Sequence, residues 1–151
     1  MGCGYVTVPT FDQATRDLLK KHVPDFQQVD SLVVQEISNF NWLWPLVEAK
    51  CFDKSACMTS ISNYFTDEIA AICSFTMPIE YFSNRYLHSM DAEEKFTALL
   101  SDHGVKLRDD ISAGLCAGSN NKEQAIALAL ICYRLRNNLF HGNKGQFGFA
   151  D

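Results

Sequence analysis

Three residues near the C-terminal end of the sequence carry side chains that together suit RNA cleavage without a metal. Arg136 offers a planar fork of N–H donors that matches a phosphodiester. His141 offers an imidazole that exchanges protons near neutral pH, and Asn137 can orient either partner through its carboxamide. Such a set activates a ribose 2′-hydroxyl, holds the phosphate and protonates the leaving 5′-oxygen. We therefore take Arg136, Asn137 and His141 as candidate catalytic residues.

The spacing of these residues places a condition on that chemistry. Five residues along a regular α-helix leave Arg136 and His141 about 140° apart around the axis. They converge if the helix breaks before His141, which Gly142 favours, or if a second copy of the chain supplies the missing group across a two-fold axis. The alternative is that these residues have no catalytic role. In that case, His141 interacts with the helix dipole and the Arg136 side chain is solvated.

The C-terminal part of the sequence differs from the rest in its charge. The chain has 13 Lys and Arg against 18 Asp and Glu, a net charge of −5, which is the wrong sign for a general nucleic-acid binder. Residues 122–151 alone are basic, with Lys122, Arg134, Arg136 and Lys144 against Glu123 and Asp151. This region either serves an anionic ligand or is an ordinary solvated helix face. On the first interpretation, Arg134 and Lys144 are candidate substrate-binding residues.

Other familiar sites are missing from the sequence. It has no phosphate-binding loop or dinucleotide fingerprint, and no zinc-protease or serine-hydrolase motif. Residues 114–119 resemble a phosphate-binding loop in composition only, and we interpret them as a connector. The six cysteines are scattered without a C-x-x-C pair, so we expect free thiols, with Cys73 and Cys132 in the core. Metal binding by Cys51 and Cys57 is the alternative, but we expect neither a metal nor a cofactor.

The elements that must position these residues are helical, because strand-type alternation is nearly absent. Capping signals and apolar spacing predict helices over residues 11–24, 31–50, 55–75, 78–87, 91–104 and 120–140. Pro45 either kinks the chain or starts a short new helix. Ile72 belongs to the expected buried stripe of the third helix. Residues 107–121 are predicted to be a loop with one helical turn.

These elements predict an all-α fold, a compact antiparallel bundle of about five to six helices. The 151 residues form one expected domain, residues 1–151, with residues 142–151 as a short or mobile tail. No apolar run reaches the length of a membrane span, so no membrane partner is expected. No secretory signal is visible at the N-terminus, which makes the cytoplasm the expected location.

The segment Arg136-Asn137-x3-His141, ahead of Gly142 and after an apolar helix, resembles the signature of the HEPN superfamily (higher eukaryotes and prokaryotes nucleotide-binding domains). The family motif is an Arg, a polar residue that is often Asn, then three to five residues and a His. Its position near the end of an all-helical domain of this length strengthens the resemblance. Outside the motif, the resemblance is one of fold class and size.

The resemblance implies a helical homodimer in which two copies of the motif meet to cleave RNA without a metal. Arg136 would hold the scissile phosphate, His141 would be the acid or base and Asn137 would orient the site. The implied setting is a toxin or phage-defence effector, with an antitoxin or other protein antagonist as a further partner. Asn143 stands where one toxin subgroup has a tyrosine that receives a nucleotide, so neutralisation by that route is not implied. The alternative function is a non-catalytic helical dimer module that binds nucleotide, RNA or a protein partner.

Overall fold

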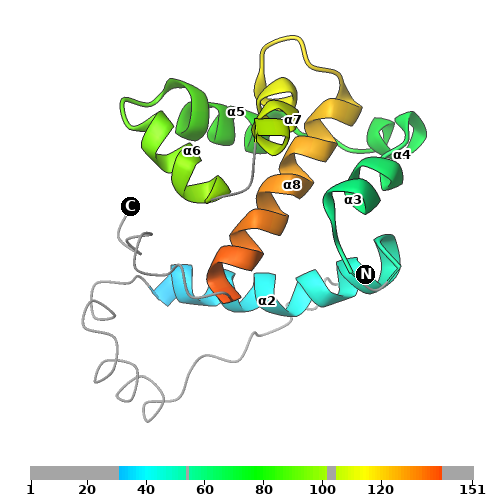
Figure 1. Ribbon diagram of the computed structural model, residues 1–151. Coiled ribbons are helices and arrows are strands. Elements are labelled where there is room, and N and C mark those ends of the chain that lie inside the picture. The colour runs from blue at the N-terminus through cyan, green and yellow to red at the C-terminus, as the bar shows by residue number, and fades with distance from the viewer. Residues whose placement is uncertain (1–30, 54, 102–104, 141–151) are drawn as a thin grey trace, which may run out of the picture. The chain divides into compact units, whose positions relative to one another are not determined.

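A computed structural model describes residues 31–53, 55–101 and 105–140, and these residues contain seven α-helices and no strand (Figure 1). The predicted all-α fold is therefore confirmed for the described part. The chain divides into two compact units, with described residues 31–46 in one and residues 47–140 in the other. The helix predicted over residues 11–24 and the predicted tail over residues 142–151 lie outside the described residues. Within the described part, no helix has the length and apolar character needed to cross a membrane.

Helix α2 runs from Ser31 to Cys51 and contains Pro45. It is one element, so the option that a separate helix starts at Pro45 is wrong. Proline removes one backbone donor from a helix interior, and the element continues despite that loss. Within the first unit, Trp44 is buried and its ring lies 5.7 Å from that of Phe40.

The single helix predicted over residues 55–75 is wrong, because the chain forms two short helices there. Helix α3 spans Met58–Tyr64 and helix α4 spans Asp67–Ala71. Thr66 separates them: its Oγ1 accepts a hydrogen bond from the Ile69 N–H (3.4 Å) and caps α4. The expected apolar stripe ends with α4, so Ile72 is exposed rather than buried, and the Cys73 thiol is exposed too.

The next two predicted helices are confirmed in type and approximate position. Helix α5 (Thr76–Ser83) continues into a π-helical turn, η2 (Asn84–His88). Helix α6 spans Ala92–Leu100 and follows Asp91 as predicted, but the Asp91 side chain makes no capping hydrogen bond. Helix α6 ends earlier than residue 104, because Ser101 takes a positive φ of 52° that does not continue a helix.

The loop predicted over residues 107–121 is wrong, because helix α7 spans Val105–Leu115. Its buried residues Leu107, Ile111 and Leu115 recur every four positions, which is the spacing of one helix face. Gly114, the first residue of the expected connector, lies inside α7 and allows close packing: a Cβ at this position would lie 2.2 Å from the Glu123 carbonyl oxygen. The connection that follows is shorter than expected.

Helix α8 (Asn121–Phe140) is the central helix of the second unit. It begins with the predicted capping box, in which the Glu123 N–H donates to Asn120 Oδ1 (2.9 Å) and the Asn120 N–H donates to Glu123 Oε2 (2.8 Å). Helix α8 contacts α3, α4, α5, α6 and α7 (Figure 1). The largest fully buried side chains of the core are Ile61, Phe96, Leu99, Leu107, Ile111, Leu130 and Ile131.

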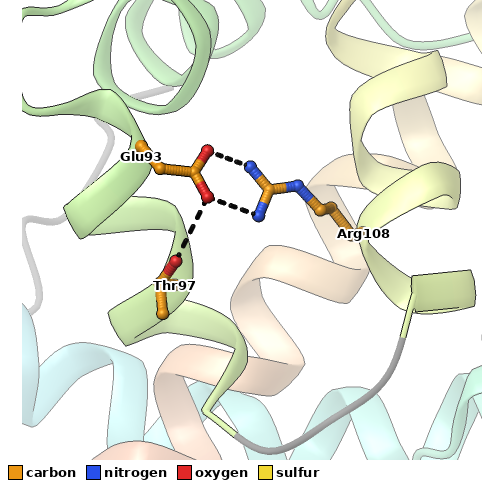
Figure 2. Close-up of polar contacts among 3 residues, drawn as sticks. All are labelled: Glu93, Thr97 and Arg108. Atoms are coloured by element: carbon orange, nitrogen blue, oxygen red, sulfur yellow. Dashed lines mark hydrogen bonds and ion pairs between the residues drawn. The ribbon is translucent and has the colours of Figure 1, made fainter.

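A polar contact joins α6 and α7 at the protein surface. Figure 2 shows the Arg108 guanidinium donating to both carboxylate oxygens of Glu93, with Arg108 Nη1 at 2.9 Å from Glu93 Oε1. Thr97 Oγ1 donates to the same carboxylate at 3.5 Å. The Arg108 guanidinium also lies 4.8 Å from the centre of the Phe96 ring, a cation–π distance.

Candidate functional site

The last two turns of α8 present two arginines to different surroundings. Residues four apart on a helix share a face, so Arg134 and Asn138 point in the same direction. Arg136 lies two residues beyond Arg134, about 200° around the axis, and points roughly the opposite way. Asn137 follows Arg136 directly. The two faces therefore meet different neighbours.

Arg134 and Asn138, which we call the α6-capping pair, are buried and bond to the end of α6. Arg134 Nε donates to the Leu99 carbonyl (3.2 Å), and its Nη2 donates to the Leu100 carbonyl (3.1 Å) and to Asn138 Oδ1 (3.1 Å). Asn138 Nδ2 donates to the Leu99 carbonyl (3.0 Å). The two side chains are 2% and 5% exposed.

The end of α6 explains this arrangement. The last carbonyls of a helix have no partner inside it, and a cation near them is stabilised by the helix dipole. Burial lowers the pKa of the Arg134 guanidinium, which nevertheless stays charged because arginine starts from so high a value. The prediction that Arg134 contacts substrate is not supported by this position, because its donors face the carbonyls of α6 inside the protein.

Arg136 and Asn137 are only partly buried. Arg136 Nη1 donates to Asn137 Oδ1 at 3.1 Å, which is the contact that an orienting role for Asn137 requires. Arg136 Nη2 lies 3.9 Å from Glu48 Oε2, the outer limit of an ion pair. About a third of the Arg136 side chain is exposed, against 12% for Glu48. The guanidinium thus donates a hydrogen bond to Asn137, lies at ion-pair distance from Glu48 and still reaches the surface.

The other predicted site residues lie beyond the described part of the chain. His141 directly follows the last described residue, and Lys144 lies three residues further on. The structure therefore brings together Arg136 and Asn137 of the predicted catalytic set. The positions of His141 and Lys144 stay predictions.

Sequence reasoning missed Glu48 and Asn138. Glu48 lies near the end of α2, far from Arg136 in the sequence, and no local pattern links the two. The spacing of Asn138 gave a weak indication of its contact with Arg134, because residues four apart lie on the same helix face. That spacing does not distinguish a surface pair from a buried one without the packed structure.

The described residues show no group of three or more His, Cys, Asp or Glu side chains arranged to hold a metal ion. Cys51, Cys57, Cys73, Cys116 and Cys132 are free thiols. The segment 114–119 closes on itself, because Ser119 Oγ donates to the Gly114 carbonyl (2.8 Å). Among the described residues, Arg136 presents a partly exposed guanidinium, whose planar donors fit a phosphate. Comparison with protein-family models, curated proteins and solved structures finds no match for this chain.

Proposed function

We propose that this chain is a metal-independent endoribonuclease of HEPN type that cleaves RNA by attack of a 2′-hydroxyl on the adjacent phosphodiester. The observation that carries the proposal is the Arg136 guanidinium, which is oriented by Asn137 and still partly exposed. A charged planar donor at the surface of a rigid helix is suited to the charge that develops on a phosphate in the transition state. The motif Arg136-Asn137-x3-His141 supplies the remaining group.

Each residue has a distinct part in the proposed reaction. Arg136 holds the non-bridging phosphate oxygens, and Asn137 keeps the guanidinium in place. His141 removes the proton from the 2′-hydroxyl or donates one to the leaving 5′-oxygen. The products are a 2′,3′-cyclic phosphate and a 5′-hydroxyl, so the step is a transesterification that consumes no water.

The proposed active form is a homodimer. One imidazole cannot be both the general base and the general acid in a single concerted step, and two-fold symmetry supplies a second His141. On one regular helix, Arg136 and His141 would lie about 140° apart. In a dimer they need not converge within one copy, because each phosphate can contact Arg136 of one copy and His141 of the other. A toxin or phage-defence effector, held in check by a protein antagonist, is the setting that we propose for this activity.

The test is an RNA-cleavage assay in EDTA, with the wild type beside His141→Ala. We expect cleavage by the wild type alone, with cyclic-phosphate ends on the 5′ fragments. A variant that cleaves as fast as the wild type would contradict the assignment of His141. Cleavage that stops in EDTA and returns with added metal would contradict the mechanism.

The second candidate is a non-catalytic dimer module that binds RNA or nucleotide. The same partly exposed guanidinium favours it, because Arg136 can hold a phosphate with no general base nearby. Binding without turnover, weakening as salt is added, would support this module over the nuclease. Retention of RNA binding by Arg136→Gln would contradict it.

A further inference from the structure

A second side chain lies close to the Arg136 guanidinium, and it comes from outside the motif. Glu48 lies in the last turns of α2, within the same compact unit as α8. Its Oε2 faces Arg136 Nη2 at 3.9 Å, and its side chain is only 12% exposed. A carboxylate with so little access to water needs partners for its charge.

Glu48 is itself fixed by the backbone. The Ala56 N–H donates to Glu48 Oε1 at 3.0 Å, across the turn that follows α2. Of the residues that follow α2, Phe52 is buried and Asp53 takes a positive φ of 47°. One carboxylate oxygen therefore closes the turn, which leaves the other aimed at Arg136.

We infer that Glu48 is a positioning residue, which holds the Arg136 guanidinium in the orientation that presents it to an RNA phosphate. This inference rests on the proposed function. Asn137 and Glu48 contact the two terminal nitrogens of the guanidinium, Nη1 and Nη2 respectively. A hydrogen bond at Nη1 and a carboxylate charge near Nη2 orient the guanidinium plane more strongly than the hydrogen bond alone.

The charge of Glu48 also limits binding in the ground state. A carboxylate beside Arg136 competes with the substrate phosphate for the same cation. Removing that charge makes Arg136 more available to RNA while it loosens the orientation. The inference therefore predicts opposite effects on binding and on turnover, which general damage to the fold would not give.

The experiment compares Glu48→Gln, Glu48→Asp and the control Glu36→Gln, an exposed residue of the same helix. Glutamine keeps an oxygen for the Ala56 N–H, so the turn closes and the unfolding temperature stays near that of the wild type. Its amide NH2 then faces a guanidinium that also only donates. We expect kcat for RNA cleavage to fall on the order of 10- to 100-fold, with KM unchanged or lower. Glu48→Asp keeps the charge and should recover part of kcat, and Glu36→Gln should match the wild type.

A second measurement needs no activity. In 15N-labelled protein, a guanidinium held by a hydrogen bond and a nearby carboxylate rotates slowly about its Nε–Cζ bond and gives separate Nη signals. We expect these Arg136 signals, assigned with Arg136→Lys, to merge in Glu48→Gln and to persist in Glu36→Gln.

The two measurements separate the inference from the proposed function. An inactive wild type whose Arg136 signals still depend on Glu48 would overturn the nuclease proposal and support the Glu48 contact. Arg136 signals indifferent to Glu48→Gln would overturn the inference, whether or not RNA is cleaved. Unchanged kcat in Glu48→Gln, with an active wild type, would overturn it as well.

Discussion

Two arginines on one helix, two residues apart, have opposite surroundings. Arg134 is 2% exposed and donates to the carbonyls that end α6, whereas Arg136 is partly exposed and lies between Asn137 and Glu48. The residue type is the same, and the turn of the helix decides the neighbours. Removing a buried donor leaves its acceptors unpaired, while removing an exposed donor returns its acceptors to water. Arg134 should therefore matter for stability and Arg136 for function.

Neutralising Arg136 should have the largest effect and tests its assignment to function. We expect Arg136→Gln to lower the rate of RNA cleavage on the order of 10²- to 10³-fold, the usual loss for one transition-state donor. Its free energy of unfolding should change by less than about 1 kcal/mol, because the side chain is partly exposed. The control Lys122→Gln removes a positive charge near the start of the same helix and should cleave at the wild-type rate. A similar loss in both variants would mean that overall charge, rather than Arg136, supports cleavage.

The reciprocal change is made at Arg134. Arg134→Met keeps much of the side-chain volume but leaves the Leu100 carbonyl and Asn138 Oδ1 without their donor. Each buried acceptor left unpaired costs about 1–3 kcal/mol, so denaturant unfolding should show a clear loss of stability. Arg136→Met, the same substitution two residues later, should cost much less. Equal losses in the two variants would be evidence against the structural role of Arg134.

The asparagines give a finer version of the same test. Asn138→Ala removes donors to the Leu99 carbonyl and an acceptor for Arg134, at about 0.5–1.5 kcal/mol for each hydrogen bond. Asn137→Ala should change stability less and cleavage more, because Asn137 bonds to Arg136. Unfolding midpoints and cleavage rates measured on both variants should rank in opposite orders. The same rank in both measurements would contradict the division of the helix into two faces.

The smallest effect is expected at the surface pair of Glu93 and Arg108. Hydrogen bonding from Arg108 lowers the pKa of the Glu93 carboxyl below its usual value of about 4.3. A lowered folded-state pKa contributes stability above the unfolded value, and that contribution is lost as pH falls through the folded value. Glu93→Gln should therefore lower the unfolding temperature slightly at pH 7, and the difference from wild type should shrink in acid. The control Glu94→Gln, exposed in the same turn, should show no such pH dependence.

Local signals predicted those parts of the fold that local contacts stabilise. The start of α8 followed from Asn120 and Glu123, because a capping box is complete within four residues. Helix α7 was missed because its short apolar stripe gains stability only by packing, including the close approach of Gly114 to α8. Propensity alone does not report such tertiary contacts.

In the candidate site, too, the sequence predicted the local contact but not the contacts between distant residues. Arg136 and Asn137 were predicted from their residue types and adjacent positions, and their contact is local. The burial of Arg134 depends on α6, and the position of Glu48 depends on how α2 ends against α8. Both contacts join residues far apart in the sequence, so the spacing of residues within the motif carried no information about them.

The most direct test of the division between the two arginines is RNA cleavage by Arg134→Met and Arg136→Met, measured in EDTA and expressed per folded molecule. The temperature is chosen so that circular dichroism shows both variants folded. We expect Arg134→Met to cleave within a few-fold of the wild type and Arg136→Met to lose nearly all activity. Full activity in Arg136→Met, or an equal loss in both folded variants, would contradict the assignment of Arg134 to the fold and Arg136 to RNA.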